Sequence, residues 1–183
     1  GFLSAAHLRS TVVLAAFIGI VALGQTFVII GGGIDLSVPW VLNAAAVLMT
    51  LAAAGQNGPL LYIVPLLLVA GALVGAINGL GVALFGVPPI IMTLAVNVIL
   101  QGGILVFTGG APTATAPPAI QFLAVGRIAG FPVILILWIV IAVVATLLLS
   151  RSAFGRYLYA VGSSAAVATF SGVPTLATTV AAY

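Results

Sequence analysis

Apolar runs of about twenty residues set the strongest limit on what this chain can fold into. The first is TVVLAAFIGIVALGQTFVII, residues 11–30, and similar runs recur along the sequence. Only 3% of the residues are charged, whereas a soluble domain carries roughly 25%. Backbone groups inside a bilayer must be satisfied within helices or closed barrels, and these runs lack the alternation of barrel strands. The sequence therefore predicts an all-α, polytopic transmembrane helix bundle.

Glycine and proline breaks divide the chain into about five complete spans and the start of a sixth. Three glycines, the turn GQNGP and the paired prolines of GVPP end the first three spans, because proline cannot continue a helix interior. We expect the polar, proline-rich stretch 108–130 not to span. The expected spans cover residues 11–30, 38–54, 60–85, 90–107 and 131–150, and a further apolar run begins at Leu176.

Alternation of the spans predicts which loops share a side of the membrane. The break at 31–37, the GVPP turn and the segment 151–174 fall on one side. The N-terminal tail, the GQNGP turn and the stretch 108–130 fall on the other. The four arginines divide equally between the two sides, so the positive-inside rule does not orient the chain.

The chain's single acidic residue lies at the first break, in VIIGGGIDLSVPWV. Pro39 has no N–H and fits only the first turn of a helix, which predicts an N-cap near Ser37. Asp35 then precedes the helix start, where the helix dipole favours a carboxylate. We interpret Gly32, Gly33, Asp35 and Ser37 as a structural turn at a membrane boundary. The alternative is a carboxylate that coordinates an ion among unwound glycine carbonyls.

A polar stripe runs along the fourth expected span. Thr93, Asn97 and Gln101 recur at spacing four and so share one helix face, and Asn78 adds an amide on the third span. One interpretation is interhelical hydrogen bonding. The other is a pathway for a neutral polyol, which needs directional hydrogen bonds and no counter-charge. The sequence leaves both open.

Gly71, Gly75 and Gly79 also recur at spacing four. This small-residue face predicts close packing of a neighbouring helix. Such packing would equally suit a membrane scaffold without transport activity.

Several kinds of chemistry lack the residues that they require. The chain has no lysine for a phosphate-binding loop and no cysteine for thiolate metal sites or disulfides. One carboxylate and one histidine, His7 in the tail, do not make a proton relay. We therefore expect no catalytic site, no metal site and no cofactor bound by this chain, and any ATP would be used by a partner subunit.

Three stretches together resemble the ribose/xylose-type sugar permeases of bacterial ATP-binding-cassette importers. They are LGQTFVIIGGGIDLSV, GALVGAINGLGVALFGVPPIIMTLAVNVILQGG and FGRYLYAVGSSAAVATFSGV, and the resemblance covers nearly the whole chain. It implies a multi-pass permease of the bacterial inner membrane that translocates a monosaccharide. The implied partners are a second permease copy, a separate ABC ATPase subunit that uses ATP, and an extracytoplasmic sugar-binding protein.

The resemblance also assigns roles to segments. It implies a single transmembrane permease domain over residues 1–183, which we expect to be incomplete at both ends. It implies that 151–174 is a cytoplasmic segment coupling to the ATPase, and by parity that 108–130 faces the sugar-binding protein. The expected substrate-pathway residues are Asn78, Thr93, Asn97 and Gln101. The expected coupling residues are Arg156, Ser163, Ser164, Phe170, Ser171 and Gly172.

Two alternatives stay open from the residues alone. Ser163 or Ser164 can cap a short helix that Gly172 ends, but an ordinary interfacial connection would look the same. The runner-up function is an ion-coupled secondary transporter that uses Asp35 at a broken helix.

Overall fold

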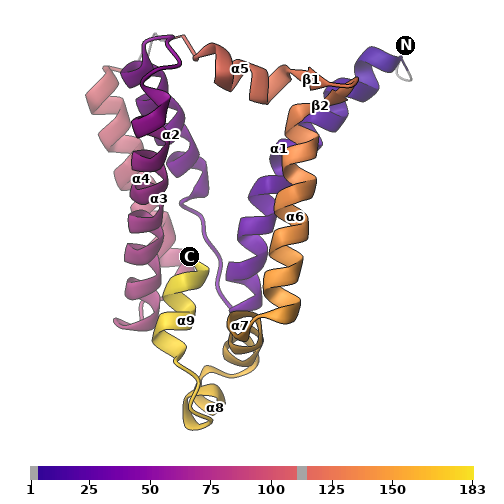
Figure 1. Cartoon of the computed structure of the whole chain (residues 1–183). Coiled ribbons are helices and arrows are strands. Elements are labelled where there is room, and N and C mark those ends of the chain that lie inside the picture. Colours follow the sequence, from indigo (N-terminus) through magenta and orange to yellow (C-terminus); the bar gives the residue numbers. More distant parts are fainter. Residues whose placement is uncertain (1–3, 111–114) are drawn as a thin grey trace.

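The computed structural model describes residues 4–110 and 115–183 (Figure 1). It confirms the predicted helical membrane bundle, because four helices in this part of the chain are long and apolar enough to cross a bilayer. These are α1 (Ala5–Ile30), α3 (Leu60–Ala83), α4 (Pro89–Thr108) and α6 (Val133–Arg151). The shorter helices are α2 (Val38–Ala53), α5 (Pro118–Val125), α7 (Ala153–Ser163), α8 (Ala165–Phe170) and α9 (Thr175–Ala182).

A small β-hairpin is the exception to the helical class. Strand β1 (Arg127–Ile128) pairs antiparallel with β2 (Phe131–Pro132). Ala129 and Gly130 between them have φ angles of 50° and 86°, as both central residues of a tight hairpin turn require. The hairpin leads directly into α6.

The long helices form two groups (Figure 1). α1 packs against α6 in one group, and α2, α3 and α4 pack against one another in the other. α9 packs along α3 and also contacts α1 and α7, so it bridges the groups at the lower end of the view. α7 and α8 lie at that same end, whereas α5 and the hairpin lie at the opposite end.

The predicted alternation of loops is confirmed at both ends of the bundle. Gly32, Pro89 and Val161 line one cavity, which brings the break, the GVPP turn and the segment after α6 together. At the other end, the N–H of Ala119 donates to Oδ1 of Asn57 at 2.9 Å. This bond joins the 108–130 stretch to the GQNGP turn.

The second expected span, residues 38–54, is confirmed as the apolar helix α2, but α2 is shorter than the thickness of the bilayer core. This helix has 16 residues, or about 24 Å, against a hydrocarbon core of about 30 Å. Figure 1 shows residues 31–37 leaving the lower end of α1 and rising between the two helix groups before α2 begins. The helix cannot start earlier, because Gly32 has a left-handed φ of 83° and Pro39 must lie in the first turn. The break is therefore an extended segment inside the bundle and not a turn at its boundary.

α9 packs against two of the three regularly spaced glycines of α3. A Cβ atom on Gly79 would lie 2.6 Å from the Cα of Val180, and one on Gly75 would collide with the backbone of Tyr183. A Cβ atom on Gly71 would meet nothing within 4 Å. The predicted close packing is confirmed for Gly75 and Gly79, where backbone meets backbone.

Gly79→Ala should lower the free energy of unfolding by about 1–3 kcal/mol, because the methyl group forces α9 away from α3. Gly71→Ala is the matched control and should leave it unchanged or raise it by up to about 1 kcal/mol through helix propensity. Both can be measured by detergent titration of the purified chain, followed by circular dichroism. Equal effects of the two substitutions would contradict the packing described for α9.

Candidate functional site

Five polar residues meet where the extended segment enters the bundle, and we call them the break cluster. Asn78 and Thr93 are completely buried, Ser37 is 1% exposed and Asp35 is 9% exposed. Gln25 is half-buried. The cluster draws on α1, the break, α3 and α4, so residues far apart in the sequence form one polar site among apolar helices.

Side chains satisfy three successive backbone N–H groups of the unwound segment. Oε1 of Gln25 accepts from the N–H of Asp35 at 3.4 Å, and Oγ1 of Thr93 accepts from that of Leu36 at 3.0 Å. Oδ1 of Asp35 accepts from the N–H of Ser37 at 2.8 Å. Gln25 also donates from Nε2 to the carbonyl of Asp35 at 2.5 Å. Non-helical backbone is tolerated at membrane depth only when protein groups bond to it in this way.

Asp35 anchors the start of α2 in place of the expected serine cap. Ser37 is the N-cap residue, as predicted, but its hydroxyl makes no capping bond. That hydroxyl donates to Oδ1 of Asp35 at 2.6 Å and accepts from Nδ2 of Asn78 at 2.9 Å. The carboxylate therefore lies beside the positive end of the α2 dipole. Oδ1 of Asn78 is buried and has no hydrogen-bond partner among the described residues.

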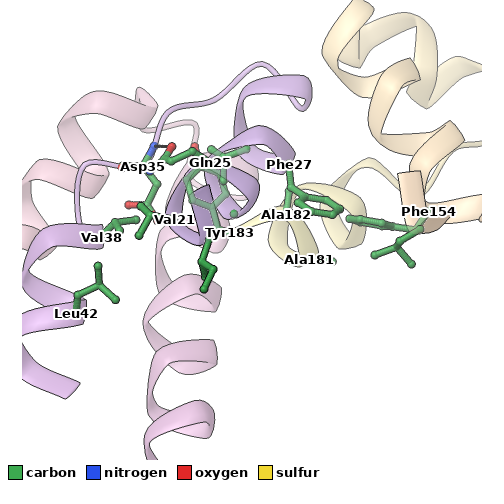
Figure 2. Close-up of a pocket in the computed structure, with 14 residues that line it drawn as sticks. Val21, Gln25, Phe27, Asp35, Val38, Leu42, Phe154, Ala181, Ala182 and Tyr183 are labelled. Atoms are coloured by element: carbon green, nitrogen blue, oxygen red, sulfur yellow. Dashed lines mark hydrogen bonds between the residues drawn. The ribbon is translucent and has the colours of Figure 1, made fainter. Parts of the chain in front are cut away.

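A cavity of about 490 Å³ lies beside the break cluster, and we call it the break cavity (Figure 2). Its polar lining residues are Gln25, Asp35 and Tyr183, and Figure 2 shows Gln25 and Tyr183 close to Asp35. The phenol oxygen of Tyr183 is buried and has no hydrogen-bond partner in the described structure. The apolar lining residues are Ile20, Val21, Gly24, Phe27, Val28, Val38, Leu42, Leu148, Phe154, Ala181 and Ala182.

The lining of the break cavity suits binding of a neutral, hydroxylated solute. A carboxylate accepts hydrogen bonds, an amide donates and accepts, and a phenol does both. The rings of Phe27 and Phe154 stack at 6.2 Å between centroids and form an apolar wall. Among the described residues, no lysine, arginine or histidine lines the cavity. Apolar walls with a few convergent polar groups are typical of small-molecule sites in this size range.

The structure separates the four expected pathway residues into two pairs. Asn78 and Thr93 belong to the break cluster and do not line the break cavity. Asn97 and Gln101 are half-buried further along α4, and Oδ1 of Asn97 is buried without a partner among the described residues. The first pair bonds to Leu36 and Ser37 of the break, so its hydrogen bonds join α3 and α4 to the unwound segment. The pathway role of the set stays a prediction.

Two lining residues were not among the expected site residues. Gln25 carries a sequence signal, because an amide inside a long apolar span is costly unless it has a partner. No feature of the sequence points to Tyr183 as a lining residue. It reaches the cavity only because α9 packs along the glycines of α3.

The expected short helix in the coupling segment is confirmed as α8. Oγ of Ser164 accepts from the N–H of Val167 at 3.3 Å and so caps it, and Gly172 follows with a left-handed φ of 79°. Ser163 instead donates to the carbonyl of Tyr159 at 2.9 Å. Phe170 is 93% exposed. The expected coupling residues Arg156, Ser171 and Gly172 are exposed as well.

α7 packs directly against the start of the break. Leu158 of α7 is completely buried, and a Cβ atom on Gly162 would collide with the carbonyl of Ile30. A Cβ atom on Gly32 would lie 3.8 Å from the Cα of Gly162. α7 and the unwound backbone therefore share an interface.

Comparison with known proteins identifies similar membrane proteins. A family described as "Branched-chain amino acid transport system / permease component" matches residues 8–183. The chain is 35% identical over 158 residues to the ribose import permease protein of Haemophilus influenzae, covering 84% of this chain and 49% of that permease. It is 33% identical over 165 residues to the autoinducer 2 import system permease protein of Photorhabdus laumondii, covering 86% and 49%.

An inner membrane ABC transporter permease protein of Escherichia coli is 32% identical over 190 aligned residues, covering 100% of this chain and 56% of that protein. The chain thus spans about half the length of these relatives. No solved structure gives a significant match. Together with the span-length helices, the relatives confirm the predicted location in the bacterial inner membrane.

Thr93→Val should lower the free energy of unfolding by about 1–3 kcal/mol, because it leaves the part-buried N–H of Leu36 without a partner. Thr108→Val on the same helix is the matched control, since that hydroxyl donates only to the carbonyl of Ile104. The emission of Trp40, in the first turn of α2, reports the break during detergent unfolding. A similar loss from both substitutions would show that Thr93 does not hold the break.

Proposed function

Since the chain belongs to the permease-component family of branched-chain amino acid transport systems, we propose that it is a permease subunit of an ATP-binding-cassette importer. Its proposed cargo is a monosaccharide. The break cavity is the observation that carries this proposal, because its polar groups can bind sugar hydroxyls without a counter-charge. The ribose import permease among the relatives supports the same class of substrate.

The polar lining of the cavity favours a sugar over an amino acid. The carboxylate of an amino acid needs a cationic or N–H-rich partner. The cavity has no cationic lining residue, and the backbone N–H groups of residues 35–37 are already bonded to side chains. A sugar instead uses the free hydrogen-bonding capacity of Asp35, Gln25 and Tyr183, with its apolar face toward Phe27 and Phe154.

The pathway continues from the cavity along α4 in this proposal. Oδ1 of Asn97 has no hydrogen-bond partner among the described residues, and Gln101 offers a second half-buried amide one turn further along the helix. Asn78 and Thr93 act on the pathway indirectly, since they hold the break that forms the wall of the cavity.

A separate ATPase subunit would drive the conformational change through α7 and α8. Phe170 and Val167 are 93% and 63% exposed on α8, which lies beyond the lower ends of the long helices (Figure 1). Since α7 contacts the break at Gly32, displacement of these helices would move the backbone that bounds the cavity. The chain itself would do no covalent chemistry and bind no cofactor.

The remaining proposed partners follow from the same assignment. A second permease copy would complete a homodimer, and an extracytoplasmic sugar-binding protein would dock at the end formed by α5 and the hairpin.

The second candidate function is an ion-coupled carrier. The observation in its favour is that Asp35 is 9% exposed and makes no ion pair within the described ranges.

Tyr183→Phe should raise the KM for sugar uptake about 5–30-fold, the loss of one hydrogen bond worth about 1–2 kcal/mol. It should leave the stability unchanged, because the hydroxyl has no partner in the described structure. The measurement is uptake of labelled ribose into vesicles that contain the permease, its ATPase and its binding protein. Tyr62→Phe, at a side chain that is 64% exposed, is the matched control.

An unchanged KM for Tyr183→Phe would contradict sugar binding in the break cavity. The same vesicles distinguish the two functions when the ATPase is omitted. Uptake that then follows a sodium gradient and is abolished by Asp35→Asn would support the ion-coupled carrier instead.

Phe170→Ala should weaken binding of the ATPase subunit about 30-fold, as expected for an exposed aromatic anchor worth about 2 kcal/mol. Sugar binding should not change, because Phe170 does not line the cavity. Co-purification and sugar-stimulated ATP hydrolysis measure the two effects. Phe107→Ala, at the far end of α4 and 67% exposed, is the matched control. Loss of ATPase binding in the control as well would refute a specific role for α8.

A further inference from the structure

A second cavity lies at the end of the bundle opposite α7 and α8, and we call it the arginine cavity. Its volume is about 510 Å³, and it lies between the first turns of α1 and the segment that leads through β1 into α6. Figure 1 shows the hairpin beside the N-terminal part of α1. The lining residues are Arg9, Ser10, Val13, Leu14, Val125, Arg127 and Pro132.

No side-chain carboxylate of this chain can neutralise the two arginines. The sequence has one acidic residue, Asp35, which is held by Gln25. Gln25 lies about 24 Å further along α1 than Arg9 at a helical rise of about 1.5 Å per residue. Both arginine side chains are exposed. Two guanidinium groups on one cavity are the arrangement that binds phosphate oxygens, because each presents paired donors to an anion.

Apart from the two arginines and Ser10, the lining residues are apolar, and on α1 this apolar face continues into the membrane-spanning part of the helix. Leu14 is 63% exposed and Ile18, one turn further, is 69% exposed on the same helix face. Val125 on the opposite wall is 71% exposed. A phosphate bound at the arginines would therefore lie at the head of an apolar strip that points toward the bilayer centre. A soluble anion would make no contact with this apolar strip, whereas the acyl chain of a lipid would pack against it.

We propose that Arg9 and Arg127 bind the phosphodiester group of an anionic phospholipid. The acyl chain of this lipid lies along Leu14 and Ile18. The bound lipid joins the first turns of α1 to the β-hairpin, two segments that otherwise carry unneutralised positive charge at one end of the bundle. Basic pockets between membrane helices bind lipid headgroups by the same electrostatics. The site is separate from the break cavity and does not depend on the transport assignment.

The test is native mass spectrometry of the full chain in mild detergent, titrated with phosphatidylglycerol or with zwitterionic phosphatidylcholine. The unmodified chain should bind one phosphatidylglycerol about tenfold more tightly than phosphatidylcholine. Arg9→Gln and Arg127→Gln should each remove most of this preference, and the double variant should remove all of it. The double variant Arg151→Gln, Arg156→Gln makes the same charge change at the opposite end and should keep the preference.

Three results would overturn the proposal. The first is an unchanged phosphatidylglycerol preference in the Arg9, Arg127 double variant. The second is displacement of the lipid by millimolar inorganic phosphate, which would identify a site for a soluble anion. The third is a double variant that keeps its lipid but no longer binds the extracytoplasmic sugar-binding protein, which would make the cavity a protein contact. Arg127→Lys, which keeps the charge but not the paired donors, should give an intermediate preference.

Discussion

The hydrogen bonds that side chains make to the unwound backbone at residues 35–37 are the interaction on which the bundle depends. A bilayer offers no water to these groups, and each buried N–H without a partner would cost about 1–3 kcal/mol. The partners are Gln25 on α1, Thr93 on α4 and the carboxylate of Asp35 itself. Because α1 and α4 belong to different helix groups, satisfying this short segment also ties the two groups together.

The position of the unwound segment explains how α7 and α8 can act on the break cavity. α2 begins inside the bundle, and the break cavity lies between its start and α1 (Figure 2). α7 contacts the start of the same segment. α9 packs on Gly75 and Gly79, and this packing places Tyr183 at the cavity. A motion imposed at α7 and α8 therefore has a short route to the cavity. This arrangement is the physical basis of the permease mechanism proposed for the chain.

The family match indicates the class of transporter, whereas the lining of the break cavity bears on the substrate. The family description names branched-chain amino acid transport, while the relatives include a ribose permease and an autoinducer 2 permease. The proposal of a sugar rests on the lining, because Gln25, Asp35 and Tyr183 offer hydrogen bonds and no described lining residue offers a cation for a substrate carboxylate. The arginine cavity at the other end has the opposite character, with two cations and no acid, so the two cavities suit different ligands.

By itself the sequence determined the membrane class, the approximate helix ends, the break after α1 and the family resemblance. These properties depend on local features, namely the length of apolar runs and the conformational limits of glycine and proline. Only the tertiary structure decided the depth of the break and the division of the polar stripe, in which Thr93 bonds to a backbone 57 residues away while Asn97 does not. It also decided the place of Tyr183, since such contacts join distant residues and leave no periodic trace in the chain.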